Sequence, residues 1–496
     1  MVQGSLMIQG TTSDAGKSIC VAGLCRVLKR KKISVAPFKP QNMALNSAVA
    51  KSVGQPEVGG EIGRAQALQA AACGLEPTTD FNPVLLKPSS DMKSQVIIHG
   101  QAVSELEART FGDIKSMAFE KVLESYWRLK KQYDVVLIEG AGSPAEVNLR
   151  KNDIANMGFA EAVDCPVVLI SDINRGGVFA HLTGTVNLLS ESEQQRIKGF
   201  IINQFRGRIE LLQSGLDWLE DYSNKKVLGV LPYLTQLKLD AEDAINSERH
   251  QQSASINIKV PVLPRISNHT DFDPLKWHPD VNLQFIGGGE SLEGADLIIL
   301  PGSKSVRSDL KFIEEQGWDK QIKRHLRYGG KLLGICGGFQ MLGNVIRDPE
   351  GIESHAGSSQ GLALFDFQTN LTQAKQLKRV SGQCHIDESS NEISGYEIHC
   401  GNSEGDALQN AFATITDQQG NTYKDGVISE DKQIIGTYIH GLFESKNSLA
   451  SILSWISGKE HVVKGWNETR ETELERLADC FEEYLDIDAI IQTIEN

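Results

Sequence analysis

The sequence predicts an α/β protein made of two successive units, each built around a mostly parallel β-sheet. Short, continuously apolar runs alternate with helical patterns along most of the 496 residues, which is typical of strands covered on both faces. A polar, charged stretch without periodicity, residues 240–255, separates two such series. We therefore predict one unit at 1–239, a linker at 240–255, a second unit at 256–447 and a helical tail at 448–496.

The apolar runs place the individual strands. In the first unit they fall at 6–9, 35–38, 135–138, 167–170, 200–202 and 227–231, and a helix is expected over 19–30. In the second unit they fall at 259–263, 296–300, 331–335 and 433–439. In the tail, four apolar residues recur at helical spacing, so we expect this face to pack on the body: Leu474, Leu477, Phe481 and Leu485.

Composition narrows the class of protein. The net charge is −14 and the sequence has no long block of Lys and Arg, so we expect no nucleic-acid partner. No apolar run approaches the length of a membrane span, and the N-terminus lacks the pattern of a signal peptide. The eight cysteines include no C-x-x-C pair, which argues against a zinc site or a disulfide framework. These features favour a cytoplasmic protein.

Residues 10–18, GTTSDAGKS, follow the first predicted strand and open the first helix. They fit a phosphate-binding loop, G-x-x-x-x-x-G-K-S, one residue longer than the common form. In such loops backbone N–H groups hold phosphate oxygens, the lysine neutralises the terminal phosphates and the serine hydroxyl binds Mg²⁺. The context disfavours the alternative, a glycine-rich turn with a surface lysine. The pattern thus predicts an ATP and Mg²⁺ site formed by Gly10, Thr12, Asp14, Ala15, Gly16, Lys17 and Ser18.

Other polar residues follow predicted strands at the same edge of the first sheet. Glu139 ends the strand at 135–138, where ligands bind in parallel sheets, and is a candidate Mg²⁺ ligand beside Ser18. Lys39 and Asn42 follow the second strand, and Arg175 follows the strand at 167–170. Their positions favour contacts with the nucleotide or a substrate carboxylate, although a plain surface role stays open for Lys39 and Arg175.

The second unit carries a pattern typical of a cysteine nucleophile. Gly334-Ile335-Cys336-Gly337-Gly338 joins an apolar strand to a helix, which predicts a tight turn that projects the sulfur. His440 ends the last predicted strand and is the candidate base. The backbone N–H groups of Gly302 and Gly337 are candidate oxyanion donors. A buried structural cysteine is the alternative, and the matching histidine disfavours it.

Ten stretches together resemble the cobyric acid synthase family, the glutamine-hydrolysing amidases of cobalamin synthesis, over about residues 5–443. The resemblance implies a fold in which a P-loop domain similar to dethiobiotin synthetase precedes a class I glutamine amidotransferase domain. The stretches are GTTSDAGKS (10–18), KPQNMALNS (39–47), EIGRAQALQAAACG (61–74), NPVLLKP (82–88), EGAGSPAEVNL (139–149), DINRGGVFA (172–180), LPGSKSVRSDL (300–310), GICGGFQMLG (334–343), GYEIH (395–399) and GTYIHG (436–441).

The resemblance also implies residue roles. Cys336 is the nucleophile, His440 is its base, and Asn203 contacts the adenine, while Lys17, Ser18 and Glu139 bind ATP and Mg²⁺. One departure from the class I pattern stands out: Leu442 occupies the position where most members carry a Glu, two residues after the histidine. The group that orients His440 is therefore unassigned, and we expect weak glutaminase activity unless the first unit is engaged.

The implied activity is amidation of the b, d, e and g carboxylates of adenosylcobyrinic acid a,c-diamide. Its small-molecule substrates are L-glutamine, ATP and the corrinoid. Two alternatives stay open at this point. One is a cobyrinic or hydrogenobyrinic acid a,c-diamide synthase, and the other is a P-loop ATPase carrying an inert amidotransferase-like module. The sequence does not specify the oligomeric state.

Overall fold

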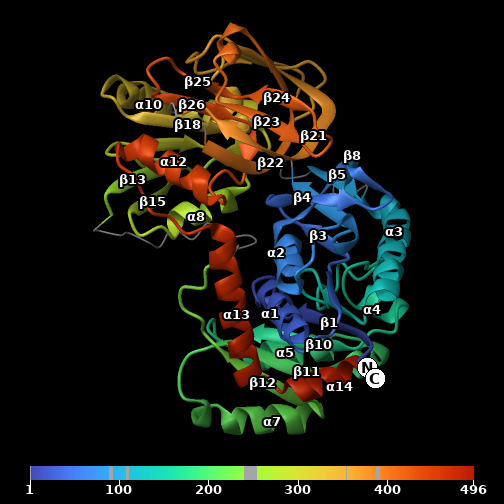
Figure 1. The fold of residues 1–496 in the computed structure, drawn as a ribbon. Helices are drawn as coiled ribbons and strands as arrows, with labels where there is room; N and C mark the ends of the chain where they lie inside the picture. Colours follow the sequence, from blue (N-terminus) through green and yellow to red (C-terminus); the bar gives the residue numbers. More distant parts are fainter. Residues whose placement is uncertain are drawn as a thin grey trace.

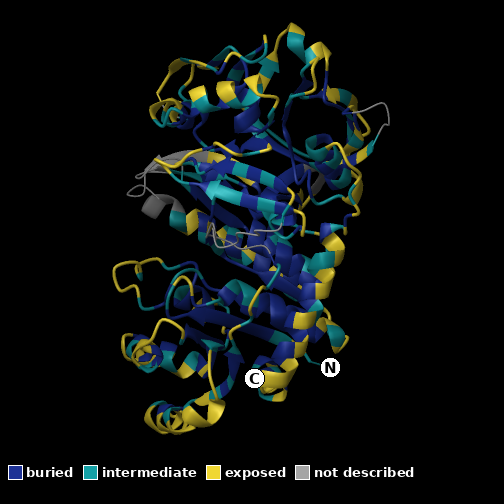
Figure 2. Cartoon of the chain, turned by 90° about the vertical axis from the view of Figure 1, so that its left-hand side faces the viewer, coloured by how far each residue is buried: buried dark blue, intermediate teal, exposed yellow. Residues whose placement is uncertain are grey.

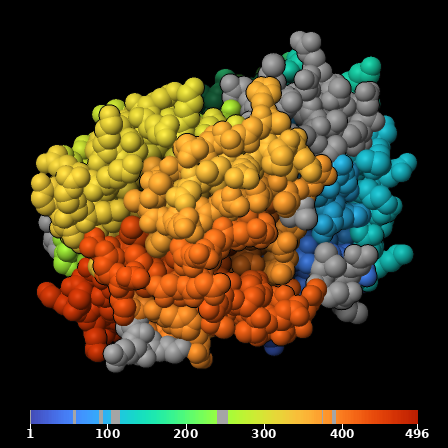
Figure 3. Space-filling view, turned by 90° about the horizontal axis from the view of Figure 1, so that it is seen from above, coloured from blue at the N-terminus to red at the C-terminus, as the bar shows by residue number. Residues whose placement is uncertain are grey.

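The computed structural model describes residues 2–88, 93–107, 111–239, 254–353, 355–386 and 391–495. Two α/β units lie one above the other, and the C-terminal helix α13 (Trp466–Tyr484) runs from the second unit down along the side of the first (Figure 1). Seen from above, the second unit, yellow to red, covers most of the view, and the first unit, blue to cyan, emerges at one side (Figure 3). Most of the predicted linker lies outside the described residues. Within the described ranges, none of the helices is long and apolar enough to cross a membrane.

The first unit is built on a six-stranded parallel sheet of order β12-β11-β10-β1-β9-β2. All six strands expected for this unit are present, and the expected helix begins at Lys17. The strands are β1 (Gly4–Gly10), β2 (Val35–Phe38), β9 (Val135–Glu139), β10 (Val167–Asp172), β11 (Ile197–Phe205) and β12 (Lys226–Pro232). The helices are α1 (Lys17–Arg30), α2 (Arg64–Cys73), α3 (Phe111–Gln132), α4 (Met157–Ala162), α5 (Val178–Asn187), α6 (Glu191–Arg196) and α7 (Gln213–Ser223).

Helices cover both faces of this sheet, which explains why its strands are apolar throughout. Leu6 and Ile8 of β1 lie in a core with α1 and α2, whereas Met7 between them lies in a second core with α3, α4, α5 and α7. Figure 2 shows the buried residues concentrated along the sheets and the exposed ones on the outer helices and loops.

Two small sheets, formed by the chain between β2 and α3, were not predicted from the sequence. One has the order β3-β6-β7-β8 and the other pairs β4 with β5. They lie on the side of the first unit that faces the second unit (Figure 1). Their strands are β3 (Gln41–Met43), β4 (Ser47–Ser52), β5 (Gln55–Gly63), β6 (Val84–Pro88), β7 (Lys93–Ile98) and β8 (Gln101–Glu107).

The second unit has a central sheet of order β15-β13-β16-β18-β26-β25, parallel except for β25. The strand expected over 433–439 is two strands, because β27 leaves the central sheet and pairs with β22. The strands are β13 (Ile256–Pro261), β15 (Val281–Ile286), β16 (Leu297–Leu300), β18 (Lys331–Ile335), β25 (Val427–Ile428), β26 (Ile434–Thr437) and β27 (Ile439–His440). The helices are α8 (Asp273–Lys276), α9 (Val306–Glu315), α10 (Trp318–Arg327) and α11 (Gly337–Met341).

A further sheet, antiparallel except where β19 pairs with β21, is added to this unit and was not predicted from the sequence. Its long hairpin, β21 with β22, reaches down to β4 and β5 of the first unit (Figure 1). A two-stranded ribbon, β14 with β17, lies near the predicted nucleophile. These strands are β14 (Ile266–Ser267), β17 (Gly302–Ser303), β19 (Val345–Asp348), β20 (Gly357–Gln360), β21 (Gln368–Cys384), β22 (Asn391–Glu404), β23 (Ala413–Asp417) and β24 (Thr422–Asp425).

The C-terminal tail divides between the two units. Helix α12 (Lys446–Ser457) packs in the core of the second unit, whereas α13 (Trp466–Tyr484) and α14 (Ile487–Glu495) pack on the first. The four apolar residues predicted to pack on the body are buried there, on the same face of the sheet as α1. Arg26 of α1 adds ion pairs to Glu471 at 2.9 Å and Glu475 at 3.0 Å.

Candidate active sites

The phosphate loop joins β1 to α1 and is held by a residue of β11, which is separated from β1 by β10 in the sheet. Gly16 has φ of 95°, a left-handed conformation that favours glycine. Asn203 of β11 donates its Nδ2 to the Ala15 carbonyl at 3.0 Å. A Cβ on Gly16 would lie 2.1 Å from that nitrogen, so a larger residue here would displace the Asn203 side chain from its bond to Ala15. Lys17 donates its Nζ to the carbonyls of Thr12 (3.0 Å), Ser13 (3.1 Å) and Gly142 (2.9 Å).

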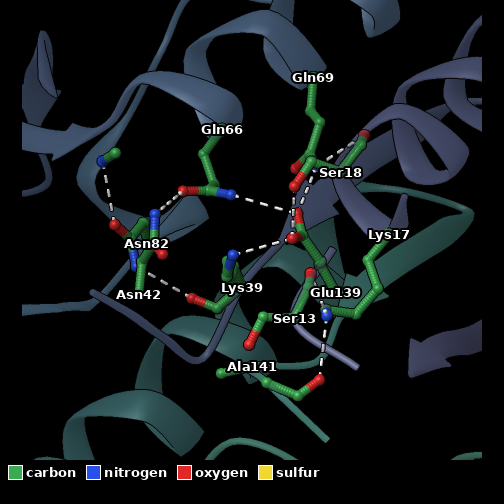
Figure 4. A network of polar contacts seen from close by, with 12 residues as sticks. Ser13, Lys17, Ser18, Lys39, Asn42, Gln66, Gln69, Asn82, Glu139 and Ala141 are labelled. Carbon is green, nitrogen blue, oxygen red and sulfur yellow. Dashed lines mark hydrogen bonds and ion pairs between the residues drawn. The ribbon is translucent and has the colours of Figure 1, made fainter. Parts of the chain in front are cut away.

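Glu139, fully buried at the end of β9, is the centre of a polar network (Figure 4). Ser18 Oγ donates to its Oε1 at 2.7 Å, and Lys39 Nζ lies 2.8 Å from the same oxygen. The Nε2 atoms of Gln69 and Gln66, both on α2, donate to Oε2 at 2.6 and 3.3 Å. Glu139, Ser18 and Lys39 were predicted from the sequence at this edge, whereas the two glutamines were not. Their i, i+3 spacing on one helix face was the available signal.

The two predicted Mg²⁺ ligands suit that ion. Ser18 and Glu139 offer hard oxygen donors, which Mg²⁺ prefers, and their oxygens are 2.7 Å apart. Among the described residues no cluster of three or more His, Cys, Asp or Glu forms a metal cage. This donor set fits a Mg²⁺ ion that takes its remaining ligands from water and nucleotide phosphates.

The other predicted residues lie around the phosphate loop. Asn42 is buried and donates to Gln66 Oε1 at 3.0 Å, one bond away from the Glu139 network. Arg175 is 65% exposed and pairs with Asp14 of the loop at 2.9 Å. Asn203 and Gly16 of the loop also line a cavity of about 210 Å³. Its apolar walls include Ile19, Leu231, Tyr233, Leu234, Leu237, Leu477 and Phe481.

Cys336 lies on the sharp turn between β18 and α11. Its φ is 53°, a value that a non-glycine residue rarely adopts, which is the strain expected of a nucleophile elbow. The residue is 6% exposed, and its Sγ lies 3.5 Å from the Ile398 carbonyl. The turn and the Ser303 backbone lie so close together that position 337 requires glycine, because a Cβ there would lie 2.8 Å from Ser303 N. A Cβ on Gly302 would lie 3.2 Å from His440 Cε1, so both predicted oxyanion donors are close to the predicted pair.

A third member of this site, Asp271, was missed from the sequence. Its Oδ2 lies 2.6 Å from His440 Nδ1, and its Oδ1 accepts from Tyr396 Oη at 3.0 Å and from Gly441 N at 3.3 Å. The Tyr396 ring stacks on the imidazole with centroids 5.4 Å apart. Asp271 precedes His440 by 169 residues in a short 3₁₀ turn (His269–Phe272), so no local spacing indicates it. Leu442, at the usual Glu position, is buried.

The Cys336–His440–Asp271 set carries charge inside the protein. Burial by itself lowers the pKa of His440. The charges of Asp271 and Cys336 and their hydrogen bonds to the ring outweigh burial, so this pKa is raised from 6.5 to about 10. The imidazole is thus held in its protonated form, which favours an ion pair with the thiolate.

The phosphate-loop site and the Cys336 site are linked by hydrogen bonds across the interface between the two units. Ser47 N donates to Asn268 Oδ1 at 3.0 Å, and His269 N donates to Asn46 Oδ1 at 3.1 Å. Asn268 Nδ2 in turn lies 3.5 Å from His440 Nδ1. The 39–47 segment therefore begins beside Glu139 and ends beside the residues that hold His440.

The first unit carries a phosphate loop beside a buried carboxylate at a strand end, and the second carries a Cys–His–Asp set at a nucleophile elbow. Together they define an ATP-dependent ligase that receives ammonia from a cysteine-type amidotransferase domain. Family models agree. Residues 6–246 match the CobQ/CobB/MinD/ParA nucleotide binding domain, and residues 257–448 match the CobB/CobQ-like glutamine amidotransferase domain. A curated cobyric acid synthase from Vibrio parahaemolyticus is 54% identical over 493 residues, covering 98% of this chain and 99% of the relative. The chain belongs to the cobyric acid synthase family.

Solved structures give weaker likenesses, from which we conclude nothing about function. PurLQS from Thermotoga maritima is 15% identical, with a TM-score of 0.29, and the match covers 46% of this chain and 99% of that one. Chloroplast FtsY from Physcomitrella patens is 16% identical, with a TM-score of 0.26, covering 46% of this chain and 58% of that one.

Proposed function

We propose that this chain converts adenosylcobyrinic acid a,c-diamide to adenosylcobyric acid by amidating its b, d, e and g carboxylates, with ATP and glutamine as co-substrates. The observation that carries the proposal is the 54% identity to a cobyric acid synthase over 493 residues, which is 98% of this chain. All eight cysteines are free, which supports work in a reducing cytoplasm. We expect small-molecule substrates and no nucleic-acid partner.

In the proposed glutaminase reaction, Cys336 thiolate attacks the side-chain amide of glutamine. The N–H groups of Gly302 and Gly337 stabilise the oxyanion, and protonated His440 gives its proton to the departing ammonia. Asp271 keeps the imidazole oriented and charged. Water then hydrolyses the thioester, which releases glutamate and restores the thiol.

In the proposed synthetase reaction, a substrate carboxylate attacks the γ-phosphorus of ATP to give an acyl phosphate and ADP. Lys17 neutralises the phosphates, and Asn203 contacts the adenine side of the nucleotide. Ser18 and Glu139 would hold Mg²⁺, which supplies charge neutralisation for phosphoryl transfer. Ammonia attacks the acyl carbon and phosphate leaves, so each amide consumes one ATP and one glutamine. Lys39, Asn42 and Arg175 stay candidates for substrate contacts at this edge.

Mass spectrometry tests this function. Cobyrinic acid a,c-diamide is incubated with the protein, Mg-ATP and glutamine, and we expect four successive replacements of a carboxylate by an amide. Cys336→Ala should lose synthesis from glutamine and keep synthesis from ammonia. Product formation from cobyrinic acid itself, ending at two amides, would favour the a,c-diamide synthase. An unchanged corrinoid with intact glutamine would favour the ATPase with an inert module.

A further inference from the structure

A cavity of about 400 Å³ opens beside the phosphate loop in the first unit, and the reaction steps above assign it no role. The short strands β3, β6 and β7 wall one side of it. The segment that follows β9, residues 141–156, walls the other. Gln41 and Met43 of the KPQNMALNS stretch lie in the first wall, and several residues of the EGAGSPAEVNL stretch lie in the second, so the two stretches border one cavity.

The wall of the cavity and the phosphate loop share a residue. Gly142 lines the cavity, and its carbonyl accepts from Lys17 Nζ at 2.9 Å. Asn156, at the far end of the same segment, bonds both backbone groups of Ala141, accepting at 3.1 Å and donating at 2.6 Å. This wall is therefore held in place, and a molecule seated against it can extend a side chain towards Lys17.

The cavity is mainly apolar. Leu86, Val96 and Ile154 are buried in its lining, and Met43 and Leu149 at its rim are 55% and 60% exposed. Two apolar side chains this exposed, next to a phosphate loop, are suited to contact with an apolar ligand.

Four charged residues line the cavity, Lys115, Glu146, Arg150 and Asp153, and the last two are held by contacts within the protein. Arg150 pairs with Glu193 and donates to the Leu188 carbonyl at 2.9 Å. Asp153 accepts backbone N–H groups of Ala155, Asn156 and Gly158 at 2.9 to 3.0 Å. Apolar side chains therefore provide most of the contact that this cavity offers a ligand, and Lys115 and Glu146 add two charged groups to its lining.

We propose that this cavity seats one edge of the corrin macrocycle, with Met43 and Leu149 against the ring and the reacting carboxylate directed past Gly142 to Lys17. The proposal rests on the proposed function. A volume of about 400 Å³ is at the low end for a drug-sized ligand, so most of the corrinoid stays outside. Such a seat explains how one site serves four carboxylates. It contacts the ring, which is constant, and is insensitive to how many side chains have become amides.

Optical titration of the protein with cobyrinic acid a,c-diamide, a coloured ligand, tests the seat directly. We expect Met43→Glu and Leu149→Glu each to raise the dissociation constant about tenfold or more, because a carboxylate replaces apolar contact. Val462→Glu is the matched control, since Val462 is fully exposed and lies outside the cavity. Thermal melting and ATP titration report whether each variant is folded.

The outcomes separate the two proposals. If the wild-type protein forms four amides but both cavity variants bind the corrinoid as tightly as Val462→Glu, the seat is overturned and the proposed function stands. If the wild-type protein neither binds nor amidates the corrinoid, both fall together. Weaker binding in the cavity variants alone supports the seat.

Discussion

At the scale of single residues, Asp271 answers the question raised by Leu442. The carboxylate is 2% exposed, and both of its oxygens are engaged, one by His440 and the other by Tyr396 and Gly441. Asp271 therefore orients the imidazole from a distant segment of the chain, whereas in the usual H-x-E pattern a Glu two residues after the histidine does so. Asn268, which immediately precedes this turn, contacts the first unit, so the orienting group lies next to the interface.

We predict that Asp271→Asn lowers glutamine-dependent turnover by about 10²- to 10⁴-fold, as expected when an imidazole loses its orienting carboxylate. The substitution keeps the shape and removes the charge that raises the pKa of His440. The alkaline limb of the kcat/KM profile for glutamine should move to lower pH, because protonated His440 is lost earlier. Ammonia-dependent synthesis should persist.

Tyr396→Phe is the matched control for this prediction. It deletes the hydroxyl on the other oxygen of Asp271 and leaves the contact with His440 in place. We expect a smaller loss of activity and little movement of the alkaline limb. An unchanged limb in Asp271→Asn would mean that Asp271 acts only on packing.

At the scale of elements, helix α2 touches both reaction centres. Gln66 and Gln69 reach Glu139, while Arg64 at its first turn pairs with Glu444, four residues after His440. Burial would raise the pKa of Glu444, but the charges of Arg64 and Arg470 outweigh it and hold this pKa well below its usual range. A displacement of Glu139 on nucleotide binding would thus be transmitted through α2 to the segment that carries His440.

We predict that Arg64→Gln uncouples the two reactions, so that more glutamate is released per amide formed. The measurement is the ratio of glutamate to amidated corrinoid at saturating ATP. Arg470→Gln is the matched control: Arg470 pairs with the same carboxylate, at 3.2 Å, from α13 rather than from α2. Equal ratios in the two variants would show that the charge of Glu444 matters and its link to α2 does not.

Sequence patterns predicted the elements whose burial is simplest. β2 and β18 are apolar throughout most of their length and match their predicted bounds, whereas β15, whose buried and half-buried residues alternate, was not predicted. The hairpin of β21 and β22 was missed because it is mostly polar and gains its order from pairing and from contact with the first unit. The site residues differ in the same way, because some can be predicted from local sequence and others depend on contacts between distant segments. Lys17, Ser18 and Cys336 lie in local motifs, whereas Asp271 becomes part of a site only through the fold.

At the scale of the whole molecule, two features hold the units together. Helix α13 starts beside the second unit and ends on the first, where its apolar face is buried (Figure 1). Across the interface, Glu61 of β5 is buried between Lys87 of β6 and Lys375 of β21, and it accepts from Ser47 Oγ at 2.6 Å. This carboxylate belongs to one unit and one of its two cations belongs to the other.

Docking of the units should therefore depend on pH through Glu61. Burial would raise the pKa of Glu61, but the charges of Lys375 and Lys87 outweigh it and hold this pKa far below its ordinary value of 4.5. The stabilisation is thus present above pH 4.5 and is lost progressively as the pH falls below that value.

We predict that Glu61→Gln lowers the free energy of unfolding at pH 7 by about 3–5 kcal/mol, because two buried lysines lose their partner. Denaturant titrations of wild type and variant should converge as the pH falls below 4.5, since a protonated Glu61 resembles glutamine. Glu76→Gln is the control: Glu76 pairs with Lys51 in solvent, so its loss should cost below about 1 kcal/mol. A gap for Glu61→Gln that stays constant with pH would mean that packing, and not the charge of Glu61, joins the two units.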